Sequence, residues 1–122
     1  MENRNALKVY YYPKCGSCRN ALKFLQAKGR ELELQDLYEK APTEEEIREW
    51  LRLSGLKARA FFNTSGEVYR EMKLKDKLPE MSEDEQIRLL ASNGRLVKRP
   101  VVTDGRKLTV GWKEEAFEAN WG

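Results

Sequence analysis

The sequence predicts an α/β fold built on a mixed, four-stranded sheet, and three parts of the chain carry that prediction. A β-like run, an amphipathic helical run and a second β-like run open the chain. Two helix-start signatures mark its middle, and an Asp-Gly turn between two β-like runs, followed by a helical run, closes it. In this order the closing hairpin supplies the antiparallel pair of a mixed sheet.

The opening of the chain is predicted to be a β-α-β unit. LKVYYY (7–12) is rich in β-branched and aromatic residues and ends at Pro13, which is typical of a strand that runs into a loop. Apolar residues then recur at helical spacing from Cys18 until Gly29 ends the pattern. In ELELQDL (31–37) leucines alternate with polar residues, which predicts a short second strand beside the first.

Two helices are predicted in the middle of the chain because two capping boxes each precede apolar residues at helical spacing. The first helix should cover residues 44–54, and one or two short helical turns should follow around residues 65–77. A glycine stands after each capped helix, where chains commonly leave the helical conformation. The capping residues are Thr43 with Glu46 and Ser82 with Glu85, and the two glycines are Gly55 and Gly94.

The last part of the chain predicts a hairpin and a terminal helix. Two β-like runs within residues 101–110 flank Asp104-Gly105, a strong hairpin signal, and residues 114–121 carry a helical pattern. The complete order of elements is that of a thioredoxin-like (glutaredoxin-like) fold with a helical insertion. Because no repeat or linker divides the chain, we expect a single domain over residues 1–122.

Composition argues against several classes of function. The formal net charge of +3 is too small for us to expect direct binding to nucleic acid. Stretches without a charge are only a few residues long, far below the ~20 apolar residues that a membrane span requires. The first residues show no export signal, so we expect a cytoplasmic protein with no membrane partner, and we expect a monomer.

The chain has two cysteines and no histidine, which leaves thiol, carboxylate or arginine chemistry. Cys15-Gly16-Ser17-Cys18 lies between the first predicted strand and its helix, where a C-x-x-C pattern is typical of a redox site. Unpaired N–H groups and the positive end of the helix dipole favour a thiolate at Cys15, and the Gly16 and Ser17 N–H groups can also bind an anion. Cys18, one turn on, is placed to attack a mixed disulfide on Cys15.

Three other interpretations of the cysteine pair stay open. A zinc site needs four ligands, so it would require thiolates from a second molecule or carboxylates, and we expect no metal. Two unrelated buried cysteines could also share this spacing. A structural disulfide is disfavoured in a reducing cytoplasm.

Two arginines and a proline complete the candidate site. In a thioredoxin-like fold the loop before the third strand faces the C-x-x-C, and an X-Pro bond there is often cis, so we expect a cis bond at Arg99-Pro100 rather than an ordinary trans proline. Arg59 and Arg99 are the candidate anion-binding residues, because a guanidinium offers forked donors that match oxyanions. For Arg59, a solvated surface residue is an equally open interpretation. The anion is expected beside Cys15.

Five stretches of the chain carry a family resemblance. They look like the glutaredoxin-coupled arsenate reductases and the Spx-type proteins, and the resemblance covers nearly the whole chain. The combination of the C-G-S-C site with K-R-P-V is its specific part. The five stretches are YYYPKCGSCRNALKFL (10–25), KARAFFN (57–63), YREMKLKDKL (69–78), LLASNGRLVKRPVV (89–102) and KLTVGWKEE (107–115).

The resemblance implies a catalytic role for Cys15 and anion binding by Arg59 and Arg99. It also implies that glutathione, glutaredoxin or thioredoxin acts as the reductant, with no bound cofactor. Two features depart from the reductase pattern. No arginine lies near residues 110–111, where the family has a third one, and Cys18 stands where the reductases have serine.

Both departures bring the chain closer to the Spx-type redox regulators, which carry a C-x-x-C switch and bind the C-terminal domain of the RNA polymerase α subunit. We expect a thiol-disulfide oxidoreductase of the arsenate reductase family that reduces arsenate or another oxidised substrate. Cys15 would be its nucleophile and Cys18 its resolving thiol. The alternative is an Spx-like redox-sensing transcriptional regulator.

Overall fold

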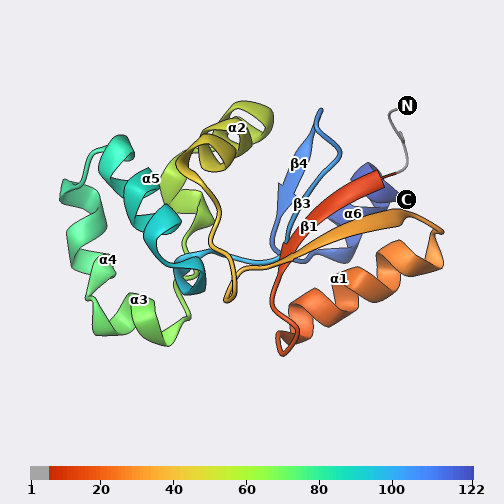
Figure 1. Ribbon diagram of the computed structural model, residues 1–122, viewed down its shortest axis with the longest axis horizontal. Coiled ribbons are helices and arrows are strands. Elements are labelled where there is room, and N and C mark those ends of the chain that lie inside the picture. The colour runs from red at the N-terminus through yellow and green to blue at the C-terminus, as the bar shows by residue number, and fades with distance from the viewer. Residues whose placement is uncertain (1–5) are drawn as a thin grey trace. The chain divides into compact units, whose positions relative to one another are not determined.

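The computed structural model describes residues 6–122, which divide into two compact units (Figure 1). One unit combines the chain up to Asp36 with Arg99–Gly122, and the other is Leu37–Lys98. The single-domain organisation expected for residues 1–122 stays a prediction. The two units are described separately below.

Within the described residues, the unit that carries both ends of the chain is built on four strands in the order β2-β1-β3-β4. The central strand β1 (Ala6–Tyr11) pairs in parallel with β2 (Glu31–Asp36) and antiparallel with β3 (Val101–Thr103). β3 pairs antiparallel with β4 (Leu108–Val110). The mixed four-stranded sheet, the parallel opening unit and the closing hairpin are therefore confirmed.

Helices α1 (Gly16–Ala27) and α6 (Glu114–Trp121) pack together against this sheet (Figure 1). The Phe24 ring of α1 meets the Phe117 ring of α6 edge to face, with 5.7 Å between the ring centroids. Burial of such side chains stabilises a fold by about 1.5–3 kcal/mol each. The fully buried cluster consists of Leu7, Val9, Ala21, Leu25, Val102, Phe117 and Trp121.

The Leu37–Lys98 unit is mostly helical. Both predicted capping boxes are present, at the starts of α2 (Glu44–Ser54) and α5 (Glu83–Ser92). Trp50 of α2 packs against Phe61 at 5.5 Å between ring centroids. No helix within residues 6–122 is long and apolar enough to cross a membrane. The shorter helical segments are η1 (Ala58–Phe61), α3 (Glu67–Glu71), α4 (Leu74–Lys77), η2 (Leu78–Glu80) and η3 (Gly94–Leu96).

Gly94 has a different role from the one its position suggests. The helix α5 ends at Ser92, and the extended residue Asn93 follows it, so Gly94 does not terminate the helix. It opens η3 instead, and a Cβ atom built on it would overlap the backbone carbonyl of Leu37. Glycine is therefore required by close backbone packing within the unit.

We expect Gly94→Ala to lower the free energy of unfolding by about 2 kcal/mol or more, because the Leu37 carbonyl has to move to admit a methyl group. Urea unfolding followed by circular dichroism measures the change. Gly16→Ala is the matched control, since nothing lies within 4 Å of a Cβ atom at that position, and it should change the free energy by less than about 0.5 kcal/mol. Equal stability of the two variants would contradict this account of Gly94.

Candidate active site

Cys15 is fixed at the junction of β1 and α1, where it is the N-cap residue of the helix. Its backbone N–H donates to the Tyr12 carbonyl at 3.1 Å, and its carbonyl accepts the first helical hydrogen bond from the Arg19 N–H at 3.0 Å. The Cys15 Sγ accepts a hydrogen bond from the Cys18 backbone N–H at 3.4 Å. The sulfur thus takes the place that a serine or aspartate oxygen occupies at most helix starts.

The surroundings of Cys15 favour its thiolate. Partial burial raises the pKa of the Cys15 thiol, but hydrogen bonds from the Cys18 backbone N–H and the Cys18 thiol lower it. A hydrogen bond from the Arg99 guanidinium and the positive charge of that group lower the pKa further. Together they hold the pKa of Cys15 below its ordinary value, as expected for a sulfur at a helix N-terminus beside a cation.

Cys18 has the opposite environment although it lies one helical turn away. Its side chain is 1% exposed on the inner face of α1. Burial raises the pKa of Cys18 to about 12, and the neighbouring Cys15 raises it as well, against a hydrogen bond with the Tyr12 backbone and the charge of Arg99. Both cysteines are free thiols in the structure. One of them is therefore poised to ionise and the other to stay protonated.

Arg99 approaches the cysteines from the segment that precedes β3. The Arg99-Pro100 peptide bond is cis, as the sequence led us to expect. The Arg99 guanidinium lies over the Tyr12 ring, with 5.4 Å from Cζ to the ring centroid, and its Nε and Nη1 atoms are buried. The Pro100 carbonyl accepts a hydrogen bond from the Gly111 N–H at 2.9 Å, which ties this segment to the hairpin.

The remaining residues of the predicted site fall into two groups. Gly16 and Ser17 occupy the exposed first turn of α1, directly after Cys15. Arg59 belongs to η1 in the Leu37–Lys98 unit and is exposed there. The residue that sequence reasoning missed is Tyr12, and its signal was an aromatic residue immediately before the loop that leads to the cysteines. Within residues 6–122 no cluster of three potential metal-ligating side chains occurs.

A mixed sheet with a cysteine pair at the start of its first helix defines a protein with a thioredoxin-like fold, and solved structures bear this out. A protein related to the ArsC family from Bacteroides fragilis superimposes with a TM-score of 0.89 at 45% identity, over 98% of this chain and 97% of that one. The family model named ArsC matches residues 10–120. The chain therefore belongs to the ArsC family.

Curated relatives carry different names. The uncharacterized protein YusI of Bacillus subtilis is 53% identical over 95% of this chain and 98% of its own length. The regulatory protein MgsR of the same organism is 30% identical, over 87% of this chain and 82% of its own. An arsenate reductase of Neisseria meningitidis is 28% identical, over 93% of this chain and 96% of its own. The relatives of this chain thus include one protein named as a regulator and one named as an enzyme.

We expect Arg99→Met to slow the alkylation of Cys15 severalfold at a pH below the pKa of that thiol. Arg99 lowers the pKa of Cys15, so its loss raises the pKa and leaves less thiolate at a given pH. The measurement is the pH dependence of iodoacetamide modification in a Cys18→Ser background. Arg19→Met removes an equal charge from the exposed side of α1, and it should leave the pH profile unchanged. A profile that does not differ between the two variants would contradict the role of Arg99.

Proposed function

We propose that the protein is a thiol-disulfide oxidoreductase in which Cys15 is the nucleophile and Cys18 the resolving thiol. The observation that carries this proposal is the placement of the two sulfurs: Cys15 caps the start of α1 and accepts the Cys18 N–H, whereas Cys18 is buried one turn on. These environments shift the two pKa values in opposite directions. The thiolate is the reactive form of cysteine, so the thiol with the lower pKa reacts first. The buried Cys18 thiol stays protonated during this first attack and reacts in the second step, when it attacks the mixed disulfide on Cys15.

The reaction consists of two thiol-disulfide exchanges. The Cys15 thiolate attacks one sulfur of a substrate disulfide, forms a mixed disulfide and releases the other sulfur as a thiolate. Cys18 then loses its proton and attacks the Cys15 sulfur, which forms the Cys15–Cys18 disulfide and releases the second thiolate. The substrate gains two electrons and the protein loses two. A thiol or dithiol reductant then reduces the Cys15–Cys18 disulfide back to two thiols. We propose glutathione, glutaredoxin or thioredoxin for this role.

An oxyanion beside Cys15 is part of the same proposal. The Arg99 charge acts on the Cys15 sulfur, and the N–H groups of Gly16 and Ser17 open α1 next to it, so an anion there would meet donors from both sides. Reduction of arsenate to arsenite would take up the same two electrons with two protons, release one arsenate oxygen as water and leave the same Cys15–Cys18 disulfide. Because no arginine lies near residues 110–111, we expect arsenate turnover below that of the related reductases.

The order of the two cysteines can be tested by trapping. With oxidised glutathione, the wild-type protein should lose two hydrogens and form an internal disulfide. Cys18→Ser should retain one glutathione on Cys15, because it has no second thiol to release it. Cys15→Ser should give neither product at a comparable rate. Intact mass spectrometry distinguishes the three outcomes.

Two results of the trapping experiment would overturn the assignment. The first is faster modification of Cys18 than of Cys15 in the single-cysteine variants. The second is the failure of any oxidant to produce the internal disulfide in the folded wild-type protein.

The anion site makes a separate prediction. Sulfate or arsenate at millimolar concentration should protect Cys15 from iodoacetamide, because the anion occupies the space that the reagent has to enter. Arg99→Ala should abolish most of this protection, whereas Arg19→Ala, on the exposed face of α1, should retain it. Equal protection of the wild type and Arg99→Ala would exclude an anion site that depends on Arg99.

A redox-sensing regulator is the second candidate function, and the 30% identity to the regulatory protein MgsR favours it. In this role the Cys15–Cys18 disulfide would be the signal, and the C-terminal domain of the RNA polymerase α subunit would be the partner. Binding of that domain to the oxidised wild type, and neither to the reduced protein nor to Cys18→Ser, would support regulation. Turnover with glutaredoxin in the absence of such binding would favour the enzyme.

A further inference from the structure

Tyr12 contacts both cysteines and the arginine of the candidate site. Its carbonyl accepts a hydrogen bond from the Cys15 N–H at 3.1 Å, and its backbone also makes a hydrogen bond with Cys18. Its ring lies against the Arg99 guanidinium, with 5.4 Å from Cζ to the ring centroid. Any residue could make the backbone contacts, whereas the contact with Arg99 needs an aromatic side chain. The ring is therefore the part of Tyr12 that other amino acids do not replace.

The antiparallel pairing of β1 with β3 accounts for the contact between the ring and the guanidinium. Tyr10 pairs with Val101, and Tyr12 and Arg99 each lie two residues beyond that pair. The same register, continued past the end of the ladder, sets Tyr12 opposite Arg99. Side chains at directly opposite positions of an antiparallel pair share a face and interact. Tyr12 is thus the side chain that the sheet brings to Arg99.

Arg99 has to be oriented before it can act on Cys15. Its hydrogen bond to the sulfur depends on direction as well as on distance. A flexible arginine side chain loses conformational entropy when it is held in one rotamer, so other contacts have to offset that loss. The titratable and charged groups with the largest effects on the Cys15 sulfur are Cys18 and Arg99. A change in the direction of Arg99 therefore changes the reactive thiol directly.

The Tyr12 ring can supply the contact that orients Arg99. A guanidinium is attracted to the face of an aromatic ring, and the attraction is stronger where water is excluded. Water is excluded from part of Arg99, because its Nε and Nη1 atoms are buried. The ring attracts the positive charge and does not occupy the N–H donors of the guanidinium. These donors can therefore still reach a thiolate or an oxyanion.

We propose that Tyr12 is a positioning residue of the site: its ring holds the Arg99 guanidinium where that group donates to the Cys15 sulfur. Tyr12 takes no part in the exchange of sulfur bonds and acts through Arg99. The proposal rests on the proposed thiol function, because Arg99 affects the reaction through Cys15. The contact between the ring and the guanidinium does not depend on that function.

Variants at position 12 separate the ring from the rest of the side chain. Tyr12→Leu removes the ring, so Arg99 should favour the Cys15 thiolate less and the pKa of Cys15 should rise. In a Cys18→Ser background, at a pH below that pKa, iodoacetamide modification of Cys15 should slow about threefold. Tyr12→Phe keeps the ring and should stay within about 1.5-fold of the protein with tyrosine. Tyr12→Met also lacks a ring, should behave as Tyr12→Leu does, and replaces that variant if it does not fold.

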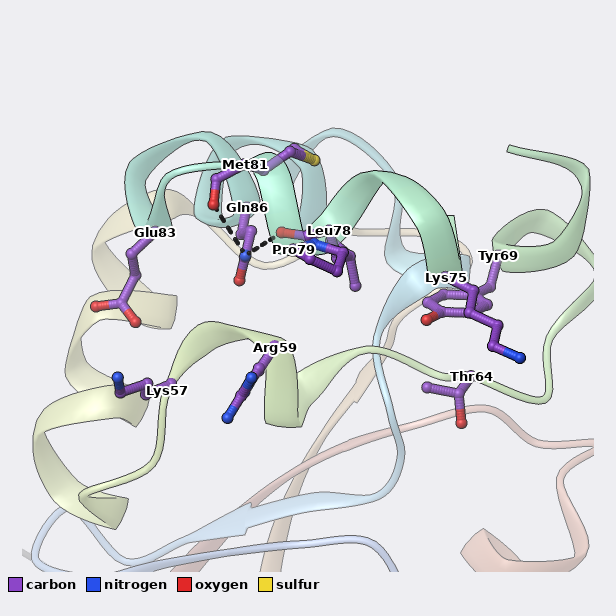
Figure 2. Close-up of a pocket in the computed structure, with 10 residues that line it drawn as sticks. All are labelled: Lys57, Arg59, Thr64, Tyr69, Lys75, Leu78, Pro79, Met81, Glu83 and Gln86. Atoms are coloured by element: carbon purple, nitrogen blue, oxygen red, sulfur yellow. Dashed lines mark hydrogen bonds between the residues drawn. The ribbon is translucent and has the colours of Figure 1, made fainter. Parts of the chain in front are cut away.

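Two controls distinguish positioning from a general disturbance of the site. In an Arg99→Met background, Tyr12→Leu should change the rate by less than about 1.5-fold, because the group through which Tyr12 acts is gone. Tyr69→Leu makes the same substitution at another half-buried tyrosine. Tyr69 lines a cavity within the Leu37–Lys98 unit (Figure 2), and its replacement should leave the pH profile of Cys15 unchanged.

The Nε–H signal of Arg99 reports the contact without any reaction at sulfur. The ring current of an aromatic side chain shifts the signals of nearby N–H groups. In ¹H–¹⁵N correlation spectra the Arg99 signal should therefore have the same position in the wild type and in Tyr12→Phe, and it should move in Tyr12→Leu. Its absence from the Arg99→Met spectrum assigns it.

Three results would overturn the role of Tyr12. They are slowing by Tyr12→Phe as large as that by Tyr12→Leu, an equal effect of Tyr12→Leu with and without Arg99, and an Arg99 signal that does not move. None of them affects the trapping experiment, which tests the order of Cys15 and Cys18. A failure of the trapping experiment would, in turn, leave the Arg99 signal as a valid measure of the contact.

Discussion

The proposed thiol site is built around one hydrogen bond, which the Cys18 backbone N–H donates to the Cys15 sulfur at 3.4 Å. The first N–H groups of a helix have no partner within the helix, and here a side-chain sulfur satisfies one of them. The bond therefore completes the start of α1 and stabilises negative charge on Cys15. A single contact serves both the fold and the reactivity of the thiol.

The strand β1 brings together the two parts of this site, the cysteines and Arg99. Its C-terminal end leads through Tyr12 to Cys15, while its antiparallel pairing with β3 brings up the segment that contains Arg99. The guanidinium lies over the ring of Tyr12, the residue that directly follows β1. Cysteine and arginine are far apart in the sequence, so their approach follows from sheet pairing. The pairing of β1 with β3 therefore brings Arg99 close to Cys15.

The sequence predicts the features that local chemistry determines and misses those that depend on packing. The capping boxes, the cysteine pair and the Asp-Gly hairpin were predictable because each is encoded within a few residues. Alternation of leucines with polar residues predicted the strand β2 but not its burial: Leu34 is 46% exposed and Gln35 is buried, because the exposure of an edge strand depends on which elements cover it. The overlap of Gly94 with Leu37 and the cation–π contact of Tyr12 arise between distant segments, where a single sequence carries no such signal.

The environments of the two thiols also impose an order on the proposed reaction. Burial is the largest cause of the high pKa of Cys18, and the hydrogen bond and negative charge of Cys15 raise it further. Once Cys15 forms a bond to a substrate sulfur, that charge is gone, while the positive charge of Arg99 stays and lowers the pKa of Cys18. Formation of the mixed disulfide therefore makes the resolving thiol easier to ionise. In the proposed reaction, Cys18 would therefore stay protonated until Cys15 bonds to a substrate sulfur, and that bond would then lower the pKa of Cys18 for its own attack.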